Sequence, residues 1–257
     1  LTLGGRYDHH SIFGSAVSPK VGLNFRVNDM VSLRASWGRG FRAPDLGQLY
    51  YQFANTGSFY QVIGNPDLSP EHSGSWQVGG EFHTRSRRGR LGLNFFRNDV
   101  RNLINSTSLG FIASPAQIVP VLTAAGLDPA LAQFIVAGRL LFVYKNLQSV
   151  YTQGIEADAS YVLPKGFQVS GAYTYLDAQD KSSAAANPYL TGRHKHQGHA
   201  KFAYSNFEYG FNANLRATFY SSWWSSATVK GDAFQLWDIY AAKTLWKDLE
   251  VYGTIDN

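Results

Sequence analysis

Hydrophobic and polar residues alternate along most of this chain with a period of two. Between residues 207 and 220, every second residue from Tyr209 to Phe219 is apolar, and the residues between them are polar or small. The side chains of a β-strand point alternately to opposite faces, so this pattern predicts a long strand with one apolar and one polar face. The same alternation recurs at 153–163 and 167–177.

The alternation predicts eleven strands joined by connections of two kinds. The strands are expected at about 1–9, 17–27, 30–41, 73–84, 90–105, 140–163, 167–178, 192–204, 208–221, 233–245 and 249–257. The short connections are 28–29, 85–89, 164–166, 205–206 and 246–248, and the long ones are 9–18, 42–73, 106–139, 179–191 and 222–232. Short turns at one end and long loops at the other are typical of outer-membrane barrels, which have short periplasmic turns and longer extracellular loops. A soluble β-sandwich would also alternate, but the strand length and the strict order of the connections favour an all-β, transmembrane antiparallel barrel.

Composition agrees with this interpretation. The chain is 44% hydrophobic and 15% aromatic but only 16% charged, and no run of eighteen apolar residues occurs, so a transmembrane helix is not expected. Tryptophan occurs near predicted strand ends, as in the aromatic belts of membrane proteins. These residues are Trp37, Trp76, Trp223, Trp224, Trp237 and Trp246.

Charged residues gather on the polar face of the predicted strands. In a soluble core each would carry a desolvation cost of several kcal/mol unless paired, whereas a wet barrel lumen accepts them. If the apolar face meets lipid, the lumen receives Arg6, Asp8, Lys20, Arg26, Arg34, Glu81, His83, Glu156, Asp158, Lys195, His199, Lys201, Glu208, Arg216 and Asp238.

The sequence offers little support for a nucleic-acid partner or for a bound metal ion. The net charge is +5, but Lys and Arg are scattered rather than clustered, so a nucleic-acid partner is not expected. Cysteine is absent. His194 and His196 would share one face of a strand and His199 the other, so a three-histidine metal site would need a bulge. We expect no metal and no cofactor.

The long loop at 106–139 has helix signals of its own. Ser114 and Asp128 each precede a proline suited to the first helical position, and Gly126 and Gly138 stand where such helices would end. The residues between them are mostly apolar, which predicts one or two short helices rather than a disordered insertion.

Two sequence boxes flank the long loop at 42–73, and further segments resemble one known family. The first box is Phe41-Arg42-Ala43-Pro44, preceded by Gly40, and the second contains Asn65-Pro66-Asp67-Leu68, followed by Ser69-Pro70-Glu71. The other segments are FFRNDVRNLI at 95–104, YKNLQSVYTQGIEADASY at 144–161, GAYTYLDA at 171–178 and VYGTIDN at 251–257. Together they resemble TonB-dependent outer-membrane receptors, including those for haem, cobalamin and siderophores.

The resemblance implies a 22-stranded barrel in outer-membrane lipid, filled by a plug domain that reaches the TonB energy-coupling complex. Residues 1–257 would then supply roughly strands eleven to twenty-one, and the plug, the first strands and the last strand would lie outside this chain. An odd number of strands fits such a fragment, because single-chain bacterial barrels have even numbers.

The loop between the boxes carries the candidate ligand site. Tyr50, Tyr51, Phe59 and Tyr60 could stack on a flat ligand, and Arg42 and Asp45 could orient it. The alternative is that these aromatic residues only pack the loop against its neighbours. The prolines of the boxes are expected to shape the loop, because proline fixes its own backbone and restrains the residue before it.

The resemblance implies energy-coupled uptake of a scarce, large nutrient such as a ferric siderophore, haem or cobalamin, without catalysis. Haem receptors of this family usually carry a histidine between the boxes, and none occurs from Asp45 to Gly64, which lowers the expectation of haem. Two other classes stay open: a passive porin, which needs no plug, and an outer-membrane enzyme, for which no spacing ties Ser, His and Asp together.

Overall fold

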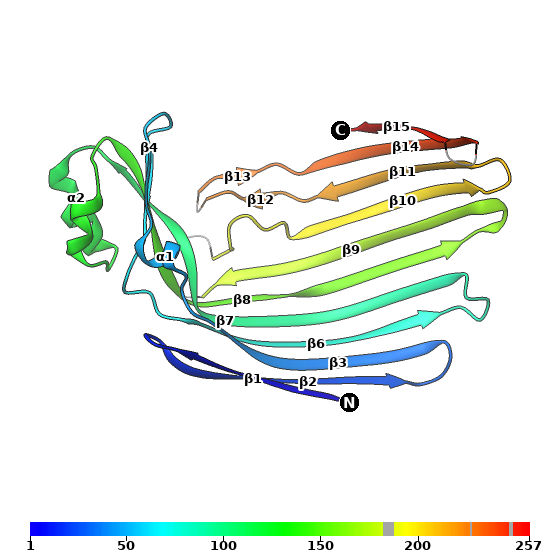
Figure 1. Ribbon diagram of the computed structural model, residues 1–257, viewed down its shortest axis with the longest axis horizontal. Helices are drawn as coiled ribbons and strands as arrows, with labels where there is room; N and C mark the ends of the chain where they lie inside the picture. The colour runs from blue at the N-terminus through cyan, green and yellow to red at the C-terminus, as the bar shows by residue number, and fades with distance from the viewer. Residues whose placement is uncertain (182–187, 227, 247–248) are drawn as a thin grey trace.

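Eleven long antiparallel strands form one curved sheet in the computed structural model of the chain (Figure 1). The structure describes residues 1–181, 188–226, 228–246 and 249–257. Each long strand pairs with the next along the chain, and the order does not close between the first and the last. The strands are β1 (Thr2–His10), β2 (Gly14–Arg26), β3 (Val31–Arg42), β6 (Glu71–His83), β7 (Gly89–Ile112), β8 (Arg139–Val162), β9 (Phe167–Asp180), β10 (His196–Asn206), β11 (Phe211–Tyr220), β14 (Phe234–Trp246) and β15 (Leu249–Asp256).

The eleven strands predicted from the alternation are confirmed, but several of their ends differ: β2 begins at Gly14 instead of 17 and β10 at His196 instead of 192. β7 continues to Ile112 instead of ending near residue 105, because its tip pairs with β8 as far as Arg139. The turn predicted at 205–206 lies at 207–210 instead, so Glu208 belongs to a turn and not to the lumen face of β11. Asn206 stabilises this turn through its side-chain oxygen, which accepts a hydrogen bond from Tyr209 N–H at 3.0 Å.

The short turns and the long loops lie at opposite ends of the sheet, as predicted, but the long connection predicted at 9–18 is wrong (Figure 1). Only residues 11–13 join β1 to β2, because the two strands pair up to His10 opposite Gly14. At one short connection, the side chain of Asn28 accepts hydrogen bonds from the backbone N–H groups of Met30 and Val31 at 2.8 and 2.9 Å. The predicted turn at 246–248 and the predicted loop at 179–191 include residues 247–248 and 182–187, which lie outside the described residues.

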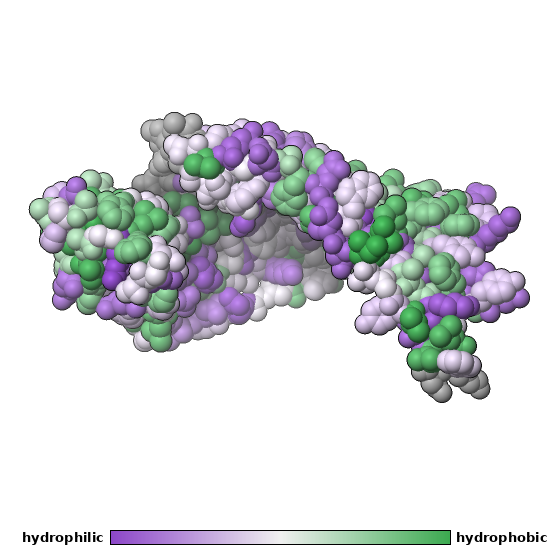
Figure 2. Space-filling model, turned by 90° about the horizontal axis from the view of Figure 1, so that it is seen from above, coloured by the Kyte–Doolittle hydropathy of each residue, from purple (hydrophilic) through white to green (hydrophobic). Residues whose placement is uncertain are grey.

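The two faces of the sheet differ in chemistry. One face exposes large apolar side chains, such as Leu23, Phe25 and Leu33, which are 53%, 64% and 48% exposed. On the other face, Glu81 lies 3.0 Å from Arg90 and 3.9 Å from Arg34, and Arg90 also pairs with Asp158. An exposed apolar face opposite a face of paired charges is the pattern expected of a wall between lipid and a wet lumen. Figure 2 shows a hollow between this wall and the loops that contain the helices.

The main buried core lies in the loops rather than in the sheet. Three short helices fold back on the tips of β7 and β8: η1 (Pro115–Gln117), α2 (Ile118–Ala124) and η2 (Pro129–Phe134). They confirm that this loop is helical, with three short helices where one or two were predicted. The buried cluster that holds them consists of Ile63, Ile112, Ile118, Leu122, Leu127, Leu131, Ile135, Leu141 and Val143.

The ends of these helices follow the residues that the sequence singled out. Asp128 accepts a hydrogen bond from Ala130 N–H at 2.8 Å, whereas Ser114 makes no such bond. Gly126 and Gly138 adopt φ angles of +68° and +83°, which residues with a Cβ rarely adopt. Among the described residues, no helix is long and apolar enough to cross a membrane.

Candidate functional site

The loop between the two boxes folds into a small helix and a hairpin that the alternation did not predict. Its elements are α1 (Leu46–Tyr50), β4 (Gln52–Asn55) and β5 (Tyr60–Ile63). Asp45 begins the helix: its Oδ1 accepts a hydrogen bond from Gln48 N–H at 2.7 Å, and the Gln48 side chain accepts one from Asp45 N–H at 3.2 Å. This reciprocal pair is a capping box, so the Asp45 carboxylate is already engaged within the loop.

The hairpin is joined to the neighbouring helical loop. β5 pairs in parallel with the tip of β8, from Tyr60 opposite Leu140 to Ile63 opposite Val143. The Gln61 side chain, 2% exposed, donates to Val136 O and accepts from Val136 N–H, both at 3.1 Å. A buried amide that satisfies both backbone groups of one residue holds the two loops together as a unit.

An ion pair closes the base of the same loop. The guanidinium of Arg42 donates to both carboxylate oxygens of Glu71, at 2.6 and 2.9 Å. One of these oxygens also accepts a hydrogen bond from the backbone N–H of Ile104 on β7, at 2.9 Å. Arg42, a candidate ligand residue in the sequence, therefore has a structural partner, and the pair ties the end of β3 to β6 and β7.

The second box shapes the other end of the loop. Asn65 donates from its side chain to Tyr144 O at 3.1 Å and accepts from Asp67 N–H at 3.0 Å. Leu68 is 2% exposed and packs in a second buried cluster with Leu49 and Ile104. Of the other box residues, Pro44 is buried, Phe41 and Ala43 are half-buried, and Pro66 and Asp67 are exposed.

Gly64, just before the second box, lies directly against the helix. A Cβ there would come within 2.6 Å of the backbone of Leu49. The absence of a side chain at this position lets α1 pack against the hairpin.

Four aromatic rings form a continuous row across the loop, here called the aromatic ladder. Tyr51 stacks on Phe53 at 5.9 Å between ring centres, Phe53 lies 5.8 Å from Tyr60, and Tyr60 meets the edge of Phe142 on β8 at 6.2 Å. Tyr51 and Phe53 remain 43% and 36% exposed, so one side of the ladder is open to solvent.

The other two candidate aromatic residues stand apart from the ladder. Tyr50 and Phe59 are 57% and 64% exposed, and no ring contact joins either to the ladder within the described part of the chain. Phe142 was not singled out in the sequence, because it follows the alternation of its own strand and reaches the loop only through the parallel pairing of β5 with β8.

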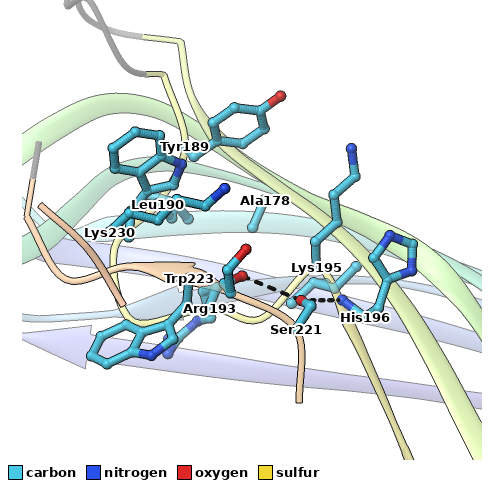
Figure 3. Close-up of a pocket in the computed structure, with 12 residues that line it drawn as sticks. Ala178, Tyr189, Leu190, Arg193, Lys195, His196, Ser221, Trp223 and Lys230 are labelled. Atoms are coloured by element: carbon cyan, nitrogen blue, oxygen red, sulfur yellow. Dashed lines mark hydrogen bonds between the residues drawn. The ribbon is translucent and has the colours of Figure 1, made fainter. Parts of the chain in front are cut away.

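A second candidate site, here called the rim pocket, lies between the start of β10 and a small hairpin of β12 (Trp223–Trp224) and β13 (Lys230–Gly231) (Figure 3). Its volume is about 280 Å³. Its lining is basic and aromatic, with no carboxylate among the described lining residues, and includes Tyr189, Arg193, Lys195, Trp223, Trp224 and Lys230. Like the aromatic ladder, it lies toward the end of the sheet that carries the long connections (Figure 1).

The contacts inside the rim pocket leave its cations available. Lys230 lies 5.9 Å from the ring centre of Trp224, and Lys195 lies 5.7 Å from that of Tyr175. No ion pair involves Arg193, Lys195 or Lys230 among the described residues. Unpaired cations beside aromatic faces suit an anionic ligand with flat, apolar parts.

The sequence did not single out this pocket. The alternation assigned Lys195 to a lumen-facing strand position, but β10 begins only at His196 and Lys195 lines the pocket. Trp223 and Trp224 were attributed to the aromatic belt and instead form a strand outside the main sheet. A sequence pattern that could have indicated the pocket was nevertheless present. Two adjacent tryptophans lie within seven residues of Lys230, in a loop rich in serine.

Each histidine near this pocket contacts a different set of residues. His196 lies 2.7 Å from the hydroxyl of Tyr173, and His194 lies among the rings of Tyr220, Trp223 and Phe234. His199 pairs opposite Ala172 farther along β10. Within the described ranges, no three His, Cys, Asp or Glu side chains are grouped so that they could hold a metal ion.

Comparisons with known proteins identify the family. The model of the TonB-dependent receptor-like β-barrel family matches residues 1–257. The iron-regulated outer membrane virulence protein of Vibrio cholerae is 28% identical over 237 residues, which cover 91% of this chain and 32% of that protein. The ferrienterobactin receptor of Escherichia coli K12 is 36% identical over 187 residues, which cover 68% of this chain and 22% of that protein. The chain thus spans about a third or less of the length of these relatives.

Solved structures show the same fold. The ferric enterobactin receptor of Pseudomonas aeruginosa, in a complex of one variant with enterobactin, matches with a TM-score of 0.71 at 20% identity, over 99% of this chain and 37% of that one. A siderophore receptor of Acinetobacter baumannii matches with a TM-score of 0.69 at 17% identity, over 99% of this chain and 38% of that one. The alternating strands, the lipid-type outer face and the match over residues 1–257 lead to one conclusion: this chain belongs to the TonB-dependent receptors and forms part of their outer-membrane β-barrel.

Proposed function

We propose that the protein to which this chain belongs captures an anionic metal chelate of the ferric siderophore class and takes it up across the outer membrane with energy from the TonB complex. The observation that carries this proposal is the rim pocket, where Arg193, Lys195 and Lys230 line the same pocket as aromatic side chains and form no ion pair with any described residue. The chain would contribute a part of the wall and two capture sites, the rim pocket and the aromatic ladder.

The names of the relatives support an iron chelate. Two of them are receptors for ferric enterobactin, from Pseudomonas aeruginosa and Escherichia coli. A negatively charged chelate with flat aromatic groups would match both the cations and the rings of the two sites. Haem and cobalamin are the competing ligands. The loop between the boxes contains no histidine from Asp45 to Gly64, which counts against haem.

In this proposal a plug domain outside residues 1–257 fills the barrel and contacts TonB. The barrel binds the chelate without converting it, because transport requires only capture and release. The two capture sites would pass the ligand inward when energy from the inner membrane moves the plug.

Uptake by the full-length receptor is therefore expected to depend on the proton-motive force. Cells that express the receptor as their only route for ferric enterobactin should accumulate radiolabelled iron, and a protonophore should abolish accumulation while leaving binding at the cell surface intact. Accumulation that continues after the proton-motive force collapses would instead identify a passive channel, and chemical conversion of the bound chelate would identify an enzyme.

The aromatic ladder is expected to contribute to ligand affinity. Replacing Tyr51 and Tyr60 together by Ala should weaken binding of ferric enterobactin about 30-fold, because two stacking contacts of this kind contribute on the order of 1 kcal/mol each. Tyr50→Ala provides the matched control, since Tyr50 is exposed and makes no ring contact with any described residue. Fluorescence titration of the purified receptor measures the affinity of each variant for ferric enterobactin. Equal affinities in the wild type and all variants would show that the aromatic ladder only packs the loop and does not contact the ligand.

A further inference from the structure

The short turn between β6 and β7 is strongly basic. Its residues Arg85, Arg87 and Arg88 are exposed, and within the described residues none of them takes part in an ion pair. The turn contains no carboxylate, whereas the short turns at 28–29 and 207–210 each carry a single charge, which is negative. Three cations without a counter-charge therefore lie together at the end of the sheet that carries the short turns (Figure 1).

The backbone of this turn is fixed by hydrogen bonds that do not involve the arginine side chains. Thr84 N–H donates to Gly89 O at 3.0 Å, and Gly89 N–H donates to the Thr84 hydroxyl at 2.9 Å. Between them, Arg87 N–H donates to Thr84 O at 2.9 Å. The turn thus presents its three cations on a fixed backbone, which does not depend on the charge of their side chains.

An apolar hollow of about 550 Å³ begins at the same turn. Its lining includes Thr84 and Gly89, which flank the arginines, and Phe82 at the end of β6. Phe82 pairs opposite Val31, and the side chains at these positions share the face that exposes Leu33, two residues along β3. The hollow therefore opens on the lipid-type face of the wall.

Small residues surrounded by large ones form this hollow. Ala159 on β8 lies opposite Gly171 on β9, so this pair presents a single methyl group between the two strands. Tyr161 and Val169, which pair next to them on the same face, are large and exposed. Within a membrane, a gap of this kind on the outer face of a barrel is filled by hydrocarbon chains of lipid.

Aromatic side chains mark the boundary of the membrane at this end of the wall. Tyr161 lies opposite Gly89, the first residue of β7. On the next strands, Phe167 lies opposite Tyr204, with 4.7 Å between the ring centres. Outer-membrane barrels carry such aromatic girdles at both interfaces, and their short turns lie on the periplasmic side. The arginines of the turn are therefore at the level of the headgroups of the periplasmic leaflet.

We infer that the basic turn and the apolar hollow together bind one anionic phospholipid of the periplasmic leaflet. The phosphate lies on the arginines, because guanidinium groups bind phosphate through parallel hydrogen bonds, and an acyl chain lies in the hollow. A zwitterionic phospholipid fits less well, since its ammonium group finds no carboxylate in this turn. A soluble anion would leave the hollow empty. This site goes beyond the proposed transport function and rests only on the location of the wall in the outer membrane.

The headgroup contact is tested with the full-length receptor in detergent, titrated with phosphatidylglycerol or phosphatidylethanolamine of identical chains and monitored by native mass spectrometry. Wild-type protein should bind phosphatidylglycerol about tenfold more tightly, because cations at a membrane surface attract anionic headgroups. The triple variant Arg85→Gln, Arg87→Gln and Arg88→Gln should lose this preference. The control replaces Arg193, Lys195 and Lys230 of the rim pocket by Gln, which removes the same charge from the other end of the wall and should keep the preference.

The hollow is tested separately by filling it. Ala159→Phe places a ring where the acyl chain would lie and should weaken binding of both lipids severalfold, while the preference for phosphatidylglycerol remains. Ala157→Phe is the matched control, since Ala157 lies two residues along the same face and outside the hollow. Binding that is equally strong in the Ala159→Phe and Ala157→Phe variants would overturn the assignment of the acyl chain to the hollow.

The outcomes separate this lipid site from the proposed transport function. Equal binding of the two lipids by the wild type, or an unchanged preference in the variant of the basic turn, would overturn the inference. Ferric enterobactin binding, measured on the same samples, should be unchanged in the variant of the basic turn and lost only in that of the rim pocket. Either site can therefore be refuted while the other stands.

Discussion

Neutralising the rim pocket is expected to weaken chelate binding about 100-fold. The variant replaces Arg193, Lys195 and Lys230 by Gln, which keeps the polar side chains and removes three positive charges from one pocket. Loss of three charge-assisted contacts of about 0.9 kcal/mol each corresponds to this factor. Isothermal titration of the full-length receptor with ferric enterobactin measures the affinity, and the remaining binding should be less sensitive to salt than that of the wild type.

The matched control removes three charges from the opposite end of the wall. Arg26 ends β2, and Arg85 and Arg88 lie in the short turn between β6 and β7, so replacing all three by Gln changes the net charge equally. This variant should bind the chelate as the wild type does. If both triple variants lose affinity to the same extent, the effect reflects overall charge, and the rim pocket is not the capture site.

The wall could be predicted from the sequence because its signal is local. Each long strand shows its own alternation, and pairing between consecutive strands needs no information from distant parts of the chain. The extension of β7 to Ile112 was missed because the residues beyond 105 lose the alternation: Ser106, Thr107 and Ser108 are polar in succession, and the register shifts between Ser108 and Gly110. Pairing with β8 compensates for this weak local pattern.

The loops could be predicted only in part, because their structure depends on contacts between segments far apart in the sequence. The helix signals around Asp128 and Gly126 were sufficient to predict that this loop contains helices. Asp45 and Gln48 have the spacing of a capping box, so α1 could have been found the same way. The parallel pairing of β5 with β8 and the meeting of Trp224 with Lys230 arise only from the folded arrangement, and no periodicity indicates them.

Several candidate residues acquired structural partners in place of free ligand-binding roles. Arg42 is paired with Glu71, and Asp45 caps α1. Both side chains remain partly exposed, so their contact with a ligand stays a prediction. These structural roles matter for mutagenesis, because a substitution of either residue would change the structure of the loop as well as any contact between the loop and a ligand.

Removing the Glu71 carboxylate is expected to loosen the whole loop between the boxes. Glu71→Ala leaves Arg42 without its partner and deprives the N–H of Ile104, a residue 7% exposed, of its acceptor. An unsatisfied buried donor costs about 1–3 kcal/mol, so the loop should open about 30-fold more often. Limited proteolysis of the full-length receptor, with cleavage mapped to residues 43–70, measures the opening. Asp67→Asn is the control, since the exposed Asp67 side chain accepts no hydrogen bond in the described structure and cleavage should not change.

Acid should open the same loop in the wild-type protein. Burial favours the neutral form of Glu71, but the hydrogen bonds from Arg42 and from Ile104 N–H outweigh it and lower the pKa of Glu71 below its ordinary value of 4.5. A carboxylate whose folded pKa is depressed stabilises the fold above its unfolded pKa, and this contribution is lost as the pH falls through the folded pKa. Cleavage of the loop by an acid protease should therefore rise steeply below about pH 4.5 in the wild type. Glu71→Gln, which has no charge to lose, should already be susceptible at pH 7 and should show a flatter pH profile; a parallel rise in both proteins would place the acid-sensitive group elsewhere.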